Sequence, residues 1–156
     1  MIVRCKRFAW TPEDVVHFGG NPLFTPVFSL TVGRDYLVLG MQFIRKSTIY
    51  GAVTLFELEN DDGVLVPAPN VLFQVVDGRA SKWWEARQDE DGDLKLCPRE
   101  FYQEYFHDDL SNRNSGALTA FREVRERLIR EFARDDELDR GTDNREIGGQ
   151  GRVALI

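Results

Sequence analysis

Between Phe28 and Cys97 the chain is divided into short runs of β-forming residues, with turn signals about every ten residues. The pair Asp62–Gly63 supplies the positive-φ geometry that a tight hairpin turn needs. Pro67 and Pro69 interrupt the pairing of the run that follows, so only Val64–Val66 is expected there as a strand. A series of short antiparallel strands of this kind predicts a small barrel-like or strongly bent β-sheet.

The expected strands are runs rich in β-branched, aromatic and aliphatic residues. Gly40 and Gly51 fall inside two of these runs, where glycine often marks a bulge or a bend. The segment Asp77–Arg79 is interpreted as a turn between two strands. The predicted strands cover 28–33, 35–45, 47–60, 64–66, 70–77, 81–88 and 93–97, with a loose edge strand within 2–10.

Helices are expected on both sides of this β region. Thr11 as N-cap and Pro12 at the first helical position predict a short helix over Thr11–Gly20. Aromatic residues at helical spacing predict a second helix over Pro98–Leu110. The clearest helix is Ala117–Ala133, with an apolar stripe that comprises Ala117, Phe121, Val124, Leu128 and Phe132.

These elements predict an α+β fold in which a short N-terminal helix and two C-terminal helices accompany the sheet. Residues 1–135 are expected to form one domain. Residues 136–156 are expected to form a flexible, charged and glycine-rich tail. The tail ends in the apolar run Arg152–Ile156, which is able to dock as an edge strand.

The sequence offers no catalytic set. Its two histidines are His17 and His107, and Cys97 lies ten residues before His107 without any nucleophile motif around it. The acidic turn Asp89–Asp93 places its glycine fourth, whereas a calcium loop of the EF-hand kind requires glycine sixth. We therefore expect a protein that is not an enzyme, with no catalytic, cofactor-binding or metal-binding residues.

The cysteine content and hydropathy favour a cytoplasmic location. Cys5 and Cys97 form no CxxC motif and are interpreted as a reduced, buried pair. No run of about 18 uninterrupted apolar residues is present, so neither export nor membrane spanning is predicted.

The net charge of −6 is concentrated in the middle of the chain. Between residues 51 and 100, acidic side chains outnumber Lys and Arg by eleven to five. Because such a surface repels phosphate backbones, nucleic acid is not an expected partner.

The paired tryptophans and the acidic turns are the candidate partner-binding features. Trp83 and Trp84 are neighbours, so in a strand one ring fills the core and the other must be covered by a helix, by the tail or by a partner. The acidic turns are expected to share one end of the sheet, where they would steer a basic partner. The predicted partner-binding residues are Asp61, Asp62, Trp84, Asp89, Glu90, Asp91 and Asp93.

A motif pattern between Phe28 and Arg87 resembles a known family. A G-x-Y-x-V-x-G strand, a P-x-x-LF-x-V-x-D segment and a tryptophan strand correspond here to Gly33, Tyr36 (one residue late), Val38, Gly40, Pro69, Leu72, Phe73, Val75, Asp77 and Trp83. The pattern is similar to that of small bacterial immunity proteins of polymorphic toxin systems, although the helical C-terminal third has no counterpart in it. The resemblance implies a compact bent sheet or barrel that neutralises a cognate protein toxin by occluding it.

Our working hypothesis is a non-enzymatic immunity protein whose partner is a basic toxin, without assignment of its oligomeric state. Two alternatives stay open. One is a small-molecule-binding or enzymatic barrel with a pocket lined by Tyr36, Tyr50, Trp83 and Trp84. The other is a structural or regulatory module of a phage or secretion assembly, in which Arg152–Ile156 docks on a neighbour.

Overall fold

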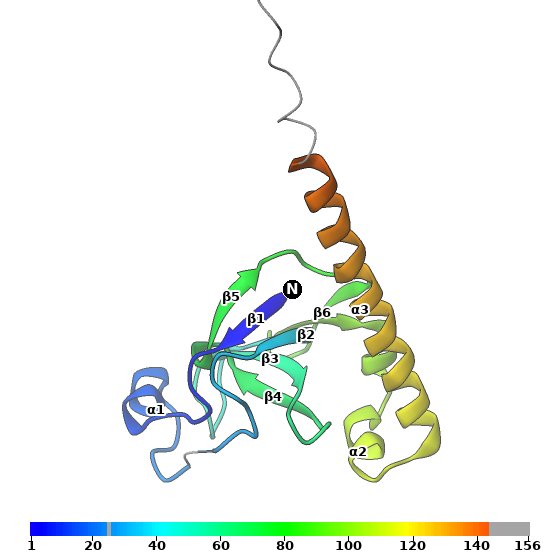
Figure 1. Ribbon diagram of the computed structural model, residues 1–156. Coiled ribbons are helices and arrows are strands. Elements are labelled where there is room, and N and C mark those ends of the chain that lie inside the picture. Colours follow the sequence, from blue (N-terminus) through cyan, green and yellow to red (C-terminus); the bar gives the residue numbers. More distant parts are fainter. Residues whose placement is uncertain (25, 144–156) are drawn as a thin grey trace, which may run out of the picture.

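The computed structural model of the chain describes residues 1–24 and 26–143, with side chains up to residue 133 (Figure 1). It confirms the predicted α+β fold, with a short N-terminal helix, a bent and unclosed antiparallel sheet and two C-terminal helices. In chain order the elements are β1 (Ile2–Cys5), α1 (Pro12–Phe18), β2 (Asp35–Ile44), β3 (Val53–Glu59), β4 (Leu65–Pro69), the 3-10 turn η1 (Asn70–Leu72), β5 (Phe73–Asp77), β6 (Trp84–Gln88), β7 (Leu94–Pro98), the 3-10 turn η2 (Arg99–Tyr102), α2 (Phe106–Ser111) and α3 (Ser115–Asp143).

The long strand β2 organises the sheet. One edge of β2 pairs with β3, and β3 pairs in turn with β4. The other edge of β2 is shared, because β1 pairs with its first half and β7 with its second half. The sheet therefore divides into two wings, β5-β1 and β6-β7, that leave the same edge of one strand.

The bend is located at Gly40. Val38 and Leu39 are neighbours in β2, so they point to opposite faces and enter different cores. The register between β2 and β3 shifts between Val38 and Gly40, which is a β-bulge after which Met41 packs on the same cluster as Val38. A Cβ atom at Gly40 would lie 2.6 Å from Glu57 Oε2 and 2.9 Å from Cys97 Cβ. Glycine is required here because neighbouring strands approach the backbone too closely for any side chain.

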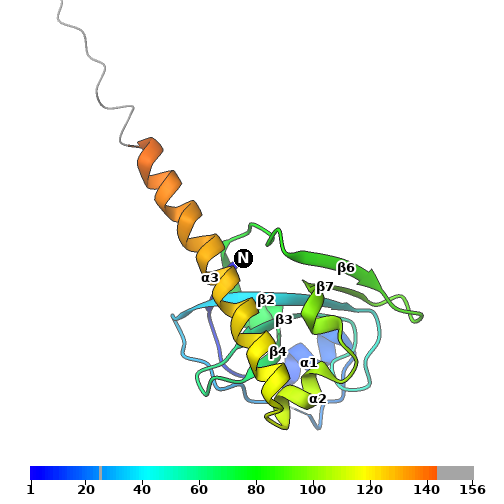
Figure 2. The same cartoon turned by 90° about the vertical axis from the view of Figure 1, so that its right-hand side faces the viewer.

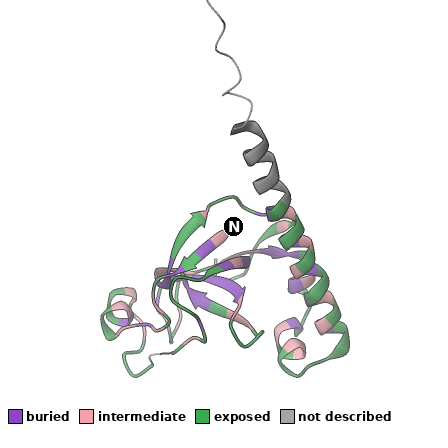
Figure 3. Cartoon of the chain, in the orientation of Figure 1, coloured by how far each residue is buried: buried purple, intermediate pink, exposed green. Residues whose placement is uncertain are grey.

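Three apolar clusters hold the fold together. The first contains β1, β2, β3 and β5 residues such as Val3, Val38 and Leu58. The second lies between the sheet and the C-terminal helices and contains Leu39, Cys97 and the α3 stripe. The third packs α1 against the end of β2 and the start of β3. Figure 3 shows buried residues gathered in the strands and on the inner side of α3. Cys5 and Cys97 are free, buried thiols in the first and second clusters.

Two helices follow the sequence rules closely. Thr11 caps α1 in a capping box with Asp14, and Gly19 ends the helix in the left-handed conformation. All five residues of the predicted α3 stripe are buried, namely Ala117, Phe121, Val124, Leu128 and Phe132. The amphipathic period therefore identified correctly which side of α3 faces the sheet.

The helix predicted over Pro98–Leu110 is wrong in its first half. The chain forms η2, then takes a positive φ of 60° at Tyr105, and begins α2 only at Phe106. The break separates the aromatic residues, since Phe101 and Phe106 are buried and stacked whereas Tyr105 is exposed. Packing of two rings on the second cluster thus overrides the helical spacing.

Other predicted boundaries also change. No strand is described at 28–33, and the residues 47–52 form a turn rather than the start of β3. β4 includes both Pro67 and Pro69, which an edge strand tolerates because its outer edge donates no hydrogen bonds. α3 continues to Asp143, beyond the predicted domain boundary at residue 135, and 144–156 with the proposed docking strand lies outside the described residues.

β5 and β6 are not a hairpin, although a turn does follow β5. Asp77 binds the Arg79 guanidinium, and the chain then crosses to the other wing of the sheet. Glu131 of α3 fixes this crossing by accepting hydrogen bonds from the Ser81 hydroxyl at 2.7 Å and from the Lys82 amide at 2.9 Å. The crossing explains why the two strands pair with β1 and β7 instead of each other.

Replacement of Gly40 by alanine tests the constraint at the bend. We expect Gly40→Ala to lower the free energy of unfolding by about 1–3 kcal/mol, because the added methyl group overlaps Glu57 and Cys97. Urea denaturation measures this change. Gly78→Ala is the matched control, since its nearest neighbour is a flexible Val75 methyl at 3.7 Å and its stability should change by less than about 0.5 kcal/mol. Equal effects of the two substitutions would contradict the assignment.

Candidate functional site: a cleft between sheet and helices

A cleft of about 1100 Å³ lies between the sheet and the C-terminal helices. Figure 2 shows α3 crossing in front of β2, β3 and β4, with α2 beside the lower end of α3. The cleft, called the helix–sheet cleft below, is lined by side chains from both layers, namely Gln42, Glu57, Glu59, Asp62, Gly63, Val64, Leu65, Pro67, Lys95, His107, Leu110, Ser111, Arg113, Leu118, Phe121, Arg122, Arg125 and Glu126.

A buried carboxylate forms the floor of the helix–sheet cleft. Glu57 is 1% exposed, on the face of β3 opposite Phe56 and Leu58. Its Oε1 accepts hydrogen bonds from Gln42 Nε2 and Lys95 Nζ, the latter at 2.9 Å. His107 Nε2 lies 3.1 Å from the same oxygen, so β2, β7 and α2 each contribute one partner.

The electrostatics of this cluster favour an ionised Glu57. Burial by itself raises the pKa of Glu57, but the His107 hydrogen bond and the Lys95 charge outweigh it, so the pKa is lower than usual. Glu57 Oε2 is buried and has no hydrogen-bond partner among the described residues. The cluster is therefore a neutralised ion pair in the interior, not a proton donor at neutral pH.

The geometry does not support a Cys97–His107 dyad. His107 directs Nε2 towards Glu57, and burial raises the pKa of the Cys97 thiol to about 12. A protonated thiol in an apolar cluster is a poor nucleophile. The Tyr102 hydroxyl is engaged by the backbone oxygens of Glu85 and Lys95, and burial raises its pKa as well.

The rim of the helix–sheet cleft carries the unpaired charges. Arg125 binds Glu59 across the cleft, from α3 to the end of β3. Arg113 and Arg122 have no ionic partner among the described residues. The acidic lining residue Asp62 has no ionic partner among these residues either. Apolar side chains share the lining, including Leu110, Leu118 and the half-exposed Val64. The cleft thus combines apolar groups with basic and acidic side chains in equal number, among which Arg113 and Arg122 are the two arginines without an ionic partner in the described part of the chain.

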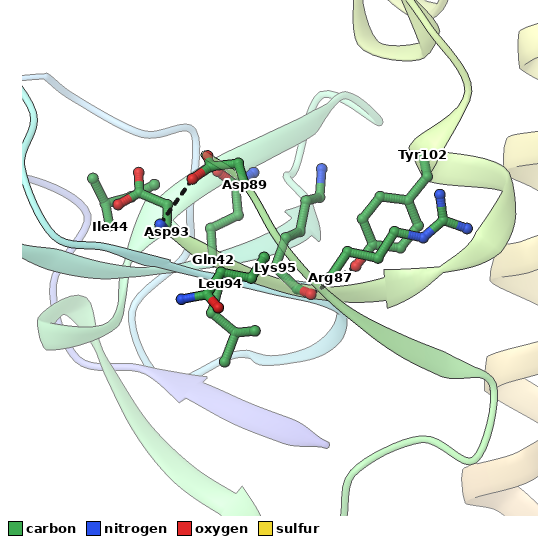
Figure 4. A pocket seen from close by; sticks show the side chains of 9 residues that line it. Gln42, Ile44, Arg87, Asp89, Asp93, Leu94, Lys95 and Tyr102 are labelled. Atoms are coloured by element: carbon green, nitrogen blue, oxygen red, sulfur yellow. Dashed lines mark hydrogen bonds between the residues drawn. The ribbon is translucent and has the colours of Figure 1, made fainter. Parts of the chain in front are cut away.

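A smaller hollow of about 270 Å³ lies beyond Lys95 on the same face of the sheet. Figure 4 shows Arg87 beside the Tyr102 ring, where its guanidinium carbon lies 4.0 Å from the ring centroid. Gln42 and Lys95 line both cavities and separate the smaller hollow from the helix–sheet cleft.

The predicted acidic turns are not together. Asp61 accepts hydrogen bonds from Thr31, Arg34 and Tyr36 near the start of β2. Asp93 accepts one from the Arg45 amide just after the end of β2. The ten residues of β2 span roughly 30 Å, so the expectation that these turns share one end of the sheet is wrong.

The other predicted residues are scattered as well. Asp62 lines the helix–sheet cleft, whereas Asp89 lines the smaller hollow and holds the β6-β7 turn by accepting from the Asp93 amide. Glu90 and Asp91 are exposed in that turn. No single surface unites the acidic residues that the sequence singled out.

The two tryptophans have different surroundings. Trp84 is half buried against the first cluster, and Trp83 is 42% exposed. The guanidinium of Arg127 on α3 lies 4.7 Å from the Trp83 ring centroid, and Glu100 binds the same guanidinium at 2.9 and 3.1 Å. The chain's own helix therefore covers part of the exposed ring.

The pocket proposed for a small-molecule barrel is absent from the described residues. Tyr36 and Trp84 pack in or against the first cluster, whereas Tyr50 stacks on Trp10 in the third. Trp83 lies at the surface next to α3. The four aromatic rings line no common cavity.

Sequence reasoning included Asp62 of the helix–sheet cleft but missed the residues that form its floor. Glu57, Gln42 and Lys95 lie in three different strands, and only the pairing of those strands brings them together. The available signal was Glu57 itself, a charged residue inside the apolar run Val53–Leu58. A charge in such a run requires a buried partner from elsewhere in the chain.

The described part of the chain offers neither a metal site nor a membrane-spanning helix. Its residues contain no cluster of three or more His, Cys, Asp or Glu side chains arranged to hold a metal ion. Within the same residues, every helix is too short or too polar to cross a membrane.

The Glu57 cluster predicts a specific dependence of stability on pH. We expect Glu57→Gln to lower the free energy of unfolding at pH 7 by about 1–3 kcal/mol, because Lys95 loses its buried counterion and His107 loses a carboxylate hydrogen-bond partner. The pKa of Glu57 is depressed in the folded protein, so its contribution is present above the ordinary glutamate pKa and is lost as the pH falls through the folded value. Urea titrations from neutral pH down to about pH 3 should therefore show the gap between wild type and variant closing.

Glu85→Gln is the control for this experiment, because Glu85 is a half-exposed partner of Arg87. It should change the stability by no more than about 0.5 kcal/mol at any pH. A stability gap for Glu57→Gln that stays constant on acidification would contradict the assignment of the cluster as an ion pair.

Comparisons of the chain with protein-family models, curated proteins and solved structures give no match. The function is therefore inferred from the geometry of the helix–sheet cleft.

Proposed function

We propose that this chain is a non-enzymatic, cytoplasmic binding protein that holds a segment of a partner protein in the helix–sheet cleft. The observation that carries the proposal is the composition of that cleft, whose lining joins apolar side chains to Arg113 and Arg122, both without an ionic partner among the residues that the structure describes. The volume of about 1100 Å³ exceeds the usual range for small-molecule pockets and suits a stretch of polypeptide.

The ionisable groups of the floor support binding rather than chemistry. Glu57 is held as a carboxylate by Lys95 and His107, and the Cys97 thiol is protonated. These groups neutralise one another and stabilise the floor beneath the bound segment. The charges left for a partner are those of the rim.

The two arginines without an ionic partner among the described residues favour an acidic segment in the partner. Arg113 and Arg122 offer planar donor groups that match carboxylates, and desolvation in a cleft strengthens such pairs. The earlier hypothesis of a basic partner depended on acidic turns meeting at one end of the sheet, and they lie at opposite ends of β2. We therefore place the contact in the helix–sheet cleft instead of the turns.

The most concrete class for this binder is an immunity protein that neutralises a cognate toxin by occlusion. The class rests on the motif resemblance, and the binding surface rests on the cleft. An immunity protein of this kind would bind an acidic segment of the toxin in the cleft between its own α3 and β4. The bound toxin would then be unable to perform its own function.

Growth protection tests the proposal. The chain is co-expressed with each protein encoded beside it, and we expect one of these proteins to be toxic alone and harmless together with the chain. Arg113→Glu with Arg122→Glu should weaken the purified complex about ten- to a hundredfold and abolish protection, because the cleft then repels an acidic segment. Isothermal titration calorimetry measures the affinity of the complex.

Arg99→Glu is the matched control, since Arg99 is exposed and lies outside the helix–sheet cleft. It makes the charge change of one of the two cleft substitutions and should leave binding and protection intact. Failure of every neighbouring protein to bind, or full protection by the double variant, would refute the proposed function.

A further inference from the structure

The outer edge of β6 is open in the described structure. β6 pairs with β7 on one side, and Figure 2 shows it at the margin of the molecule. The edge strand β4 has two prolines that blunt its outer edge, whereas β6 contains none. Residues Glu85 to Gln88 are all exposed, so the edge is accessible.

The direction of the free backbone groups of β6 follows from its pairing. Trp84 lies opposite Pro98, which has no amide hydrogen, and the Asp89 amide donates to the Asp93 oxygen at 3.0 Å. Hydrogen-bonded pairs alternate in an antiparallel ladder, so Glu85 and Arg87 bond to β7. The amide and carbonyl groups of Ala86 and Gln88 therefore point outward from the sheet.

The side chains of this strand are complementary to a second copy of the same strand. Glu85 and Arg87 lie on one face, 3.0 Å apart, and are about half exposed. If two β6 strands pair antiparallel about a two-fold axis at Ala86, each Glu85 lies opposite the Arg87 of the other chain. The two Ala86 residues then exchange their outward amide and carbonyl groups.

We propose that the chain forms a symmetric dimer through its β6 edges, which join two sheets into one continuous sheet. This proposal does not depend on the proposed function, since the helix–sheet cleft lies elsewhere in the fold. The apolar face beside the edge becomes continuous too, because Phe43, Ala86 and Leu94 are partly or fully exposed there. A five-residue edge buries less than the roughly 1,000 Å² typical of stable dimers, so the association is expected to depend on concentration.

Sedimentation equilibrium of the full chain, from about 1 µM to about 1 mM, tests the dimer. In a dimer of Glu85→Arg, each new arginine lies opposite Arg87 of the other chain, which gives two pairs of like charges. The dimer dissociation constant should therefore rise at least about tenfold. Arg87→Glu should act similarly. The double variant, Glu85→Arg with Arg87→Glu, restores opposite charges and should return the constant to within about threefold of wild type.

Ala86→Pro tests the backbone contact. It removes the outward amide of Ala86, which β7 does not use, so dimerisation should be lost while the monomer keeps its fold. Thermal unfolding of each variant verifies the fold, and Val75→Arg tests the other open edge on β5, where Val75 is 51% exposed. A chain that stays monomeric throughout this range, a double variant without rescue, or dimer loss only in Val75→Arg would overturn the proposal.

Discussion

The close approach of three strands at Gly40 is the constraint on which the rest of the structure depends. One edge of β2 pairs with β3. The other edge pairs first with β1 and then with β7, and the change of partner occurs at the bulge of β2. Val38 and Leu39 point to opposite faces of β2 and enter separate cores, so one strand organises two hydrophobic clusters. A side chain at Gly40 would overlap the Glu57 carboxylate and the Cys97 side chain, so both neighbours would have to move.

The same approach leads to the buried ion pair. Because β7 lies against the second half of β2, Lys95 reaches the Glu57 carboxylate from a neighbouring strand, and His107 reaches it from α2. A carboxylate that is 1% exposed would be costly without these partners. The cluster therefore couples the position of α2 to the pairing of the sheet, and the helix–sheet cleft is formed by elements that Glu57 holds together.

The sequence predicted those parts of the fold whose causes are local. The α3 stripe is recognisable because its period places Phe121, Val124 and Leu128 on one face, and α1 is recognisable from the cap at Thr11. The breaks around Tyr105 and after Asp77 depend on contacts with distant residues. The candidate site was not predictable for the same reason, since its floor combines residues that are far apart in the chain and meet only through strand pairing.

The acidic composition shows how a global charge differs from a local one. The sequence suggested a basic partner because acids outnumber bases most strongly between residues 51 and 100. In the structure many of those acids have internal partners, with Glu57 bound by Lys95 and Asp61 by Arg34. Each of these paired acids is offset by the basic side chain next to it. Because salt screens distant charges, a partner responds mainly to the charges close to its own binding surface. A ligand in the helix–sheet cleft therefore meets the charges that stay without a partner among the described residues, which are Arg113 and Arg122 together with Asp62.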